Sequence, residues 1–270
     1  MGVLNVTPDS FSDGGQYLDS DKAVGRAFEI EHAGANILDI GGESTRPGSA
    51  GISAQEEMRR VVPVLEKLRG QLQIPISIDT SKSEVAEAAA DQGAEIINDV
   101  TALRGDPRLA AIAAHRKLPL ILMHMHGEPR TMQEKPFARD VMAEVTNGLE
   151  QAVAAARRAG VAKSQILVDP GIGFGKSTQQ NFELLARLPE LAELGFPLLV
   201  GTSRKSFIAK ALGTDGKGER LWGTAATVAA SILGGAHIVR VHDVAAMVQV
   251  AVIADAIANR GAVSSKLGSL

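Results

Sequence analysis

The sequence contains no cysteine, and its 270 residues include only one tryptophan and one tyrosine. Without cysteine, the chain cannot form a disulfide framework or a thiolate metal site. This composition fits a cytoplasmic protein, which is the location we expect. The N-terminus lacks a basic segment followed by a long apolar run, which argues against a signal peptide. The sequence also lacks a run of about 18 apolar residues, which argues against a membrane-spanning helix.

The charge and the length of the chain narrow its class further. The formal net charge is −3, so the protein has no general electrostatic attraction for DNA or another polyanion, and any phosphate-binding site must be local. Hydrophobic residues make up 45% of the sequence, which is enough for a substantial core. Barrels of parallel strands often have about this length as one domain. We therefore expect one domain that spans residues 1–270.

Eight short apolar runs recur along the chain. They are nearly continuous in valine, isoleucine and leucine rather than alternating with polar residues, a pattern typical of parallel strands that are buried on both faces. The runs are Gly2–Val6, Asn36–Ile40, Pro75–Ile78, Glu95–Val100, Leu118–Met123, Ile166–Val168, Pro197–Val200 and His237–Val241.

Segments with helical signals separate these runs. Two of them begin with capping-box patterns, Ser53–Glu56 and Ser81–Glu84, and the first continues with an apolar stripe at helical spacing. Strands that alternate with helices in this number predict an α/β protein, a closed (β/α)8 TIM barrel, rather than an open doubly wound sheet. The first strand starts at residue 2, so either helix-end loops or a longer natural N-terminus must cover the barrel floor. The stripe is Met58, Val61, Val62, Leu65 and Leu68, and further helices are expected near residues 21–34, 107–116, 141–159, 178–187, 219–234 and 244–259.

Polar side chains stand at or just after the end of every predicted strand. In a barrel of this type, the chemistry takes place at the C-terminal ends of the strands. Burying one such group unpaired costs roughly 1–3 kcal/mol when it is neutral and more when it is charged. Some of these groups could satisfy loop amides, but their presence at all eight ends predicts a functional site. They are Asn5, Asp39, Glu43, Asp79, Asn98, Asp99, His124, His126, Asp169, Ser203–Lys205, Arg240, His242 and Asp243.

Three motifs each allow a second interpretation. The segment Asp169–Ser177 ends in Gly-Lys-Ser like a P-loop, but Pro170 stands where a P-loop needs glycine and has no amide hydrogen for a phosphate. Its glycines indicate either close backbone approach to a flat ligand or tight strand-to-helix turns. His124 and His126 could form a metal pair, but no third ligand has a suitable spacing, which favours one hydrogen-bonded histidine inside and one in the loop. Lys205 could form a Schiff base or donate hydrogen bonds as a point charge.

Eight segments, taken in order, resemble the dihydropteroate synthases of the pterin-binding barrel family. They span nearly the whole chain, and each is individually specific. Corrinoid-linked methyltetrahydrofolate methyltransferases share the barrel and a pterin pocket, and a catalytically inactive ligand-binding barrel is a third hypothesis. Release of pyrophosphate would distinguish the first from the other two. The segments are Met1–Gly15, Asp39–Gly48, Ser77–Thr80, Ile97–Asp99, Leu122–Met125, Asp169–Lys176, Ser203–Lys205 and Arg240–Asp243.

The resemblance implies a transferase of folate biosynthesis. Such an enzyme joins 6-hydroxymethyl-7,8-dihydropterin pyrophosphate to p-aminobenzoate with Mg2+, is a target of sulfonamides, and is expected to be a homodimer. It implies the catalytic residues Lys205, Asp79, Asp169 and Arg240. The pterin would be held by Asp79, Asn98, Asp169 and Lys205, the pyrophosphate by Asn5, Arg240 and His242, with Asn5 also reaching Mg2+, and the p-aminobenzoate by Thr45, Arg46, Pro47, Phe174 and Ser206.

The chemistry of this reaction suggests its path. Negative charge grows on pyrophosphate as its bond to carbon breaks, so stabilisation of the leaving group should dominate the rate. The electron-rich pterin can stabilise the positive charge left behind, which favours an SN1-like path in which the arylamine attacks second. We also expect the loops 7–18 and 44–52 to become ordered when the pterin pyrophosphate binds, so that p-aminobenzoate binds second.

Overall fold

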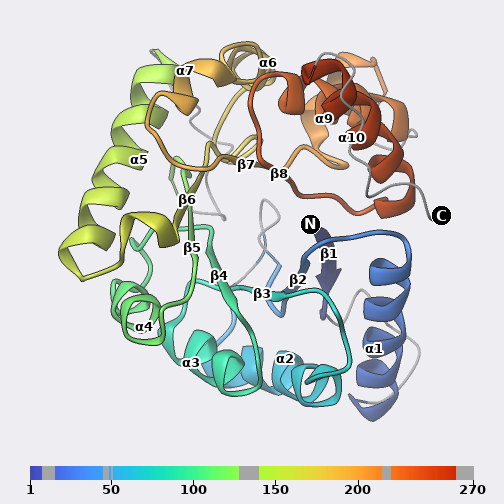
Figure 1. Cartoon of the computed structure of the whole chain (residues 1–270), viewed down its shortest axis with the longest axis vertical. Coiled ribbons are helices and arrows are strands. Elements are labelled where there is room, and N and C mark those ends of the chain that lie inside the picture. The colour runs from blue at the N-terminus through green and yellow to red at the C-terminus, as the bar shows by residue number, and fades with distance from the viewer. Residues whose placement is uncertain (8–15, 45–48, 50, 128–139, 215–219, 260–270) are drawn as a thin grey trace.

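Eight parallel strands close into a barrel in this computed structural model, which describes residues 1–7, 16–44, 49, 51–127, 140–214 and 220–259. Six strands form one sheet in chain order, and the last two form a second pair. Parallel bridges join Val168 to Leu198 and Gly2 to Val241, so the two sheets meet on both sides and the ring closes (Figure 1). The strands are β1 (Gly2–Asn5), β2 (Leu38–Gly41), β3 (Ile76–Asp79), β4 (Ile96–Asp99), β5 (Leu120–Met123), β6 (Ile166–Asp169), β7 (Leu199–Val200) and β8 (Ile238–Val239). All eight predicted strands and the predicted (β/α)8 fold are confirmed.

Helices surround this ring of strands (Figure 1). Six of those expected from the sequence lie between successive strands, and α9 and α10 flank β8. Two short helices, α7 and α8, were not predicted, because five or six residues are too few to show a helical period. The helices are α1 (Gln16–His32), α2 (Ala54–Leu68), α3 (Ser83–Asp91), α4 (Arg108–Arg116), α5 (Val141–Arg158), α6 (Thr178–Ala186), α7 (Leu188–Ala192), α8 (Ser206–Ala211), α9 (Leu221–Leu233) and α10 (Val244–Ala258), with the 3-10 turn Lys163–Gln165 before β6.

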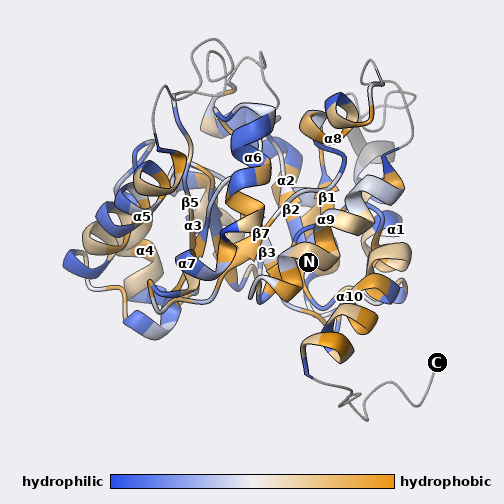
Figure 2. Cartoon of the chain, turned by 90° about the horizontal axis from the view of Figure 1, so that it is seen from above, coloured by the Kyte–Doolittle hydropathy of each residue, from blue (hydrophilic) through white to orange (hydrophobic). Residues whose placement is uncertain are grey.

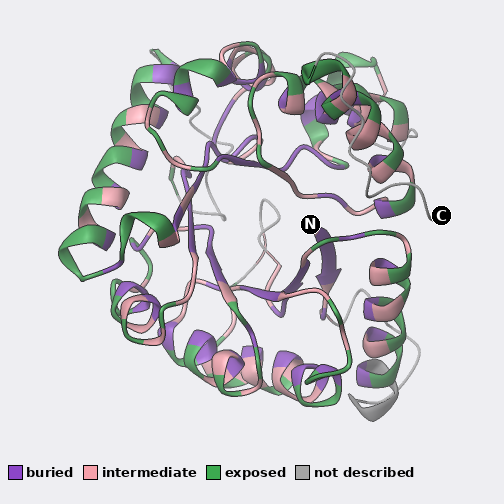
Figure 3. Cartoon of the chain, viewed as in Figure 1, coloured by how far each residue is buried: buried purple, intermediate pink, exposed green. Residues whose placement is uncertain are grey.

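The core lies between the strands and the inner faces of the helices (Figure 3). The strand residues Leu38, Ile40 and Ile78 are fully buried, as expected for parallel strands that are covered on both faces. Within the described residues, no helix is long and apolar enough to cross a membrane. Hydrophobic residues are frequent in the strands and in parts of the helices that surround them (Figure 2). Of the predicted stripe on α2, the fully buried members are Val61, Leu65 and Leu68, while Met58 and Val62 are partly exposed.

The helix starts follow the sequence in part. The Ser53 hydroxyl accepts a hydrogen bond from the amide of Glu56 at 3.2 Å, which confirms the first capping prediction. The second capping prediction is wrong, because α3 begins two residues after Ser81 and no side chain of its N-cap residue bonds to the first turn. Instead, the Asp106 carboxylate from the next loop accepts the amide of Ser83 at 3.0 Å. The first turn of α3 is therefore capped by a residue distant in sequence and not by Ser81.

Candidate active site

Arg240, which follows β8, forms two ion pairs across the mouth of the barrel. Its Nε donates to Asp39 at 2.6 Å and its Nη2 donates to Asp79 at 2.7 Å. Asp39 is fully buried, so its charge needs such a partner. Burial acts to lower the pKa of Arg240, but Asp39 and Asp79 outweigh it and the pKa is raised. The guanidinium is therefore a permanent positive charge at the centre of the site.

The strand register brings Asp79 and Asn98 to one level. Asp79 pairs with Gly41 on one side and with Asn98 on the other. The Asn98 amide nitrogen donates to Asp39 at 3.2 Å, which fixes the orientation of the amide group. Burial, only partly opposed by Arg240, raises the pKa of Asp79 to about 7. The sequence named Asp39 only as a polar residue of its strand, yet it orients two of the predicted site residues.

Asp169 and Lys205 form the opposite side of the site. Asp169 ends β6 and accepts a hydrogen bond from the amide of Gly171 at 2.7 Å. The Lys205 ammonium donates to the carbonyl of Ile172 and lies 4.5 Å from the centre of the Phe174 ring. Burial raises the pKa of Asp169, and the Lys205 charge opposes that rise. Burial likewise lowers the pKa of Lys205 to about 8, with Asp169 acting in the other direction.

The loop after β6 fits closely against the loop after β5. Gly171 and Gly175 both have positive φ, and a Cβ atom at these positions would meet the carbonyl oxygens of His124 and His126 at 1.8 and 2.4 Å. Glycine is required there both by the backbone conformation and by the lack of space. The positive φ values agree with the predicted tight turns, while the close approach is to the neighbouring loop of the protein.

The contacts of Lys176 agree with the rejection of a P-loop in the same segment. Lys176 is 2% exposed, and its ammonium donates to the carbonyls of Gly171 at 2.9 Å and Phe174 at 3.0 Å. Its ammonium is therefore bonded within its own loop, whereas a P-loop lysine reaches a phosphate. Ser177 is the N-cap of α6, with a capping box completed by Gln180. That Ser-x-x-Gln pattern was a readable signal in the sequence that the P-loop comparison obscured.

The groups after β7 and β8 are paired with one another. The Ser203 hydroxyl lies 3.1 Å from both the amide and the Nδ1 atom of His242. Burial and the Arg240 charge lower the pKa of His242 to about 4, so the ring is neutral at neutral pH. Arg204 has a φ of 58° and forms an ion pair with Asp243, with Nε donating at 2.9 Å.

Two further polar residues have structural roles. The Asp99 carboxylate accepts hydrogen bonds from the amide and hydroxyl of Thr101 and from the amide of Leu103. It therefore holds its own loop rather than pointing into the site. The buried ring of His124 lies 3.2 Å from the Lys176 ammonium through Nδ1, while His126 is partly exposed. Among the described residues, no cluster of three or more His, Cys, Asp or Glu side chains is arranged to hold a metal.

The remaining predicted residues lie at the edge of the described structure. Asn5 ends β1 at the mouth of the barrel and is partly exposed. Thr45, Arg46 and Pro47 fall outside the described residues, as do most of the loops 7–18 and 44–52 for which ordering was expected.

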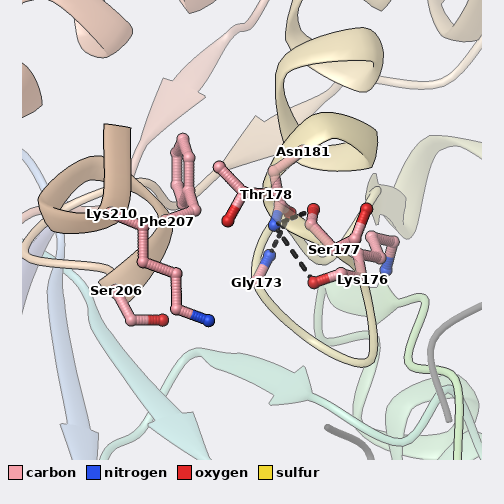
Figure 4. A pocket seen from close by; sticks show the side chains of 8 residues that line it. All are labelled: Gly173, Lys176, Ser177, Thr178, Asn181, Ser206, Phe207 and Lys210. Atoms are coloured by element: carbon pink, nitrogen blue, oxygen red, sulfur yellow. Dashed lines mark hydrogen bonds between the residues drawn. The ribbon is translucent and has the colours of Figure 1, made fainter. Parts of the chain in front are cut away.

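A cavity of about 270 Å³ adjoins this site between the starts of α6 and α8. Figure 4 shows the side chains that line it, with Lys210 and Ser206 on one side and Asn181 and Ser177 on the other. Two of the residues that line it, Ser206 and Gly173, stand next in sequence to Lys205 and Phe174. The carboxylates at the strand ends are not among its walls.

These features define a (β/α)8 barrel whose polar site lies at the C-terminal ends of its strands. The family described as pterin binding enzyme matches residues 1–242 of the chain. The dihydropteroate synthase of Synechocystis sp. is 50% identical over 257 residues, which cover 95% of this chain and 89% of the relative.

Solved structures agree with this relationship. The dihydropteroate synthase of Clostridium difficile, solved with pteroic acid, has a TM-score of 0.89 and 45% identity, covering 95% of both chains. The Xanthomonas albilineans enzyme, solved with 4-aminobenzoic acid, has a TM-score of 0.88 and 45% identity, covering 95% of this chain and 92% of its own. The chain belongs to the pterin binding enzyme family and, within it, to the dihydropteroate synthases, which are transferases.

The close approach at Gly171 predicts a large loss of stability on substitution. We expect Gly171→Ala to lower the free energy of unfolding by roughly 3 kcal/mol or more, because the methyl group collides with the His124 carbonyl in addition to the cost of positive φ. Gly70→Ala is the matched control, since Gly70 has nearly the same φ but nothing within 4 Å of its Cβ position. It should cost only about 1–2 kcal/mol. Urea unfolding measures both, and equal losses would contradict the close approach.

Proposed function

We propose that this chain joins 6-hydroxymethyl-7,8-dihydropterin pyrophosphate to p-aminobenzoate in the cytoplasm, giving 7,8-dihydropteroate and pyrophosphate. The observation that carries the proposal is a set of four polar groups at the ends of four different strands around one site: Asn98 and Asp169, which are buried, and Asp79 and Lys205, which are half-buried. Relatives have been solved with pteroic acid, with 4-aminobenzoic acid and with 7,8-dihydropteroate. A Yersinia pestis relative has been solved with a sulfonamide drug, which supports the same inhibitor class here.

The pterin edge matches the donors and acceptors of this set. One oxygen of Asp169 accepts the amide of Gly171, and a carboxylate has capacity for two further N–H donors of an amino-pyrimidinone ring. The Asn98 amide nitrogen donates to Asp39, which aims its oxygen as an acceptor. Lys205 donates to the ring carbonyl or nitrogen from the other side. Together these groups fix the plane of the ring.

The p-aminobenzoate would lie between the pterin and the cavity beside α8. Phe174 supplies an aromatic face under the Lys205 ammonium, and Ser206 lines the cavity. Thr45, Arg46 and Pro47 are proposed to complete this pocket by resemblance.

The pyrophosphate would be bound by Arg240, His242 and Asn5. A guanidinium has five N–H donors, so the bonds to Asp39 and Asp79 leave capacity for phosphate oxygens. His242 is neutral in the ligand-free site and would contribute a hydrogen bond rather than a charge. The Asn5 amide oxygen is a hard ligand that suits Mg2+, which binds few protein groups together with substrate phosphates. When bound there, Mg2+ supplies positive charge to the leaving pyrophosphate.

Charge considerations favour an SN1-like path for this reaction. The C–O bond to pyrophosphate breaks first, its electron pair leaves with the phosphate, and Arg240 stabilises the added negative charge. The nitrogen of p-aminobenzoate then bonds to the methylene carbon and loses a proton. The carboxylates that face the pterin stabilise the transient positive charge.

Turnover and an isotope effect test the reaction and its path. We expect formation of dihydropteroate, with an equal amount of pyrophosphate, to require both substrates and Mg2+, and each omission should abolish it. Deuterium on the reacting methylene should slow a single turnover measurably, because the carbon becomes trigonal before the amine attacks. An isotope effect near unity would reject the SN1-like path, whereas absence of dihydropteroate would reject the function itself.

Asp169→Asn should weaken binding of pteroic acid about a hundredfold, because two charge-assisted hydrogen bonds to the pterin lose roughly 3 kcal/mol together. Asp99→Asn is the matched control, since Asp99 is also a buried carboxylate whose pKa is raised by burial but bonds only to its own loop. The control should lose roughly 1–3 kcal/mol of stability and keep its affinity within about twofold. Titration calorimetry decides; similar affinity losses in both variants would contradict the role of Asp169.

A second copy of the chain is proposed to cover α9 and α10. The buried residues of α9 include Thr224, Thr227 and Ser231, while Trp222 is 76% exposed. Helix α10 contributes the exposed side chains of Ile253 and Ile257. In Figure 2, α10 carries hydrophobic colour over much of its surface. A helix that is apolar on its outer face needs a cover, and a surface almost without charge matches itself in a twofold dimer.

Ile257→Lys should convert this dimer to a monomer, because a twofold interface receives the charge twice. Ala111→Lys adds the same charge at an exposed position on α4, on the opposite side of the barrel (Figure 1), and should leave the mass unchanged. Sedimentation gives the mass, and the single tryptophan, Trp222, should shift its emission to the blue on association. A wild-type monomer at high concentration would reject the interface.

A further inference from the structure

Lys176 places a buried ammonium group inside the loop that follows β6. Its side chain is 2% exposed. The ammonium bonds to the carbonyls of Gly171 at 2.9 Å and Phe174 at 3.0 Å. It also lies 3.2 Å from Nδ1 and 3.4 Å from the carbonyl oxygen of His124. The Lys176 ammonium therefore links the loop after β5 to the loop after β6.

The stretch between the two carbonyls carries contacts to two site residues. The amide of Gly171 donates to Asp169, and the carbonyl of Ile172 accepts from the Lys205 ammonium. The Lys205 ammonium also lies over the ring of Phe174. We propose that Lys176 is a positioning residue for the reaction, holding residues 171–174 in the shape that aims Asp169 and Lys205 at the pterin. This inference rests on the proposed function for the identity of the ligand.

His124 is the partner of Lys176 in the loop after β5. Burial, followed by the charge of Lys176, lowers the pKa of His124, so the ring is neutral and Nδ1 accepts from the ammonium. Its position is also fixed by α5, because a Cβ atom at Gly148 would lie 2.6 Å from His124 Cδ2. His124 and the Gly-Lys-Ser segment therefore belong to one hydrogen-bonded arrangement.

The neutral side chain of Asn181 also holds the loop that follows β6. The Asn181 oxygen accepts the amide of Gly173 at 2.6 Å, and its nitrogen donates to the carbonyl of Ser177 at 2.9 Å. An uncharged side chain is therefore sufficient to form hydrogen bonds with backbone groups of this loop. What a lysine adds is a positive charge near Asp169, which helps to keep that carboxylate ionised.

The charges around Asp169 determine the direction of the effect. Burial raises its pKa, and Lys205, the Gly171 amide, Lys176 and Arg240 oppose that rise. Lys176 in turn faces Asp169, Lys205 and Arg104, besides neutral His124; burial lowers its pKa to about 7, with Asp169 opposing. Removing Lys176 takes away one of the charges that favour the Asp169 anion. Binding of a pterin to the carboxylate should then fail at a higher pH than in the wild type.

Lys176→Met removes the ammonium and keeps most of the stem. We expect the affinity for pteroic acid to fall at least tenfold at neutral pH, and its loss on acidification to begin at higher pH. Gln165→Met is the control, because Gln165 also donates to two carbonyls, those of Ala113 and Leu118 at 3.0 and 2.9 Å, but just before the opposite end of β6. It should lose stability and keep both the affinity and its pH profile. Parallel changes in the two variants would overturn the proposal.

A chemical rescue separates charge from structure. The 270-residue sequence has no cysteine, so in its Lys176→Cys variant only one thiol can react. Its sulfur displaces bromide from 2-bromoethylamine in urea, and the refolded protein carries an ammonium on a side chain of nearly the length of lysine. Iodoacetamide treatment gives a neutral side chain instead. Affinity should return with the first reagent and not with the second, and equal outcomes for the two would reject the role of the charge.

Two further measurements apply if Lys176→Met does not fold or if the wild type does not bind pteroic acid. Lys176→Gln, prepared without unfolding, replaces Lys176→Met if the methionine variant does not fold, and it should show the same tenfold loss. Hydrogen exchange at the Gly171 amide needs no ligand; it should accelerate in both Lys176 variants and not in Gln165→Met. If the wild type fails to bind pteroic acid, the proposed function fails, while the exchange result still decides whether Lys176 holds the loop.

Discussion

The ion pairs of Arg240 connect the closure of the barrel to the formation of its site. Strand β8 has only two residues, so few backbone hydrogen bonds join it to its neighbours. Arg240 reaches beyond β1 to partners 201 and 161 residues away in sequence, on β2 and β3. Because Asp39 is fully buried, an open barrel would leave its charge unpaired, at a cost of several kcal/mol. Correct closure and correct placement of these polar groups are therefore the same event.

Around this centre, three of the groups proposed to bind the pterin are held in place by neighbouring groups of the protein. Asp39 orients Asn98, the Gly171 amide orients Asp169, and the carbonyl of Ile172 with the Phe174 ring orients Lys205. Such support keeps side chains in place before a ligand arrives, so less order has to be imposed on binding. The raised pKa of Asp79 and the lowered pKa of Lys205 show that burial opposes this preorganisation.

The sequence predicted the strands well because continuous apolar runs bounded by polar residues leave few alternatives in a chain of this length. The sequence was less informative about the direction in which each polar side chain points. Asn98 and Asp99 are consecutive on β4, so their side chains leave the strand on opposite sides, and only the structure shows that Asn98 bonds to Asp39 while Asp99 bonds to its loop. The cap at Ser83 was also out of reach, since its acceptor, Asp106, is 23 residues away. Once the P-loop was rejected, Lys176 had no predicted role, because burial cannot be read from a single lysine in a sequence.

Helix α9 shows how the site determines the outer surface as well. The loop after the two-residue strand β7 has backbone groups that need partners, and the inner face of α9 supplies them: the Thr224 hydroxyl accepts the amide of Arg204 at 3.2 Å, and the Thr227 hydroxyl lies 2.9 Å from that of Thr202. Polar residues are therefore required on the side of α9 that faces the barrel. Large apolar side chains then remain on its outer side, where Trp222 and Leu233 are exposed. The helix that fixes the Ser203–Lys205 segment thus presents the surface proposed for a second subunit, so covering that surface would also restrain the backbone that carries Lys205.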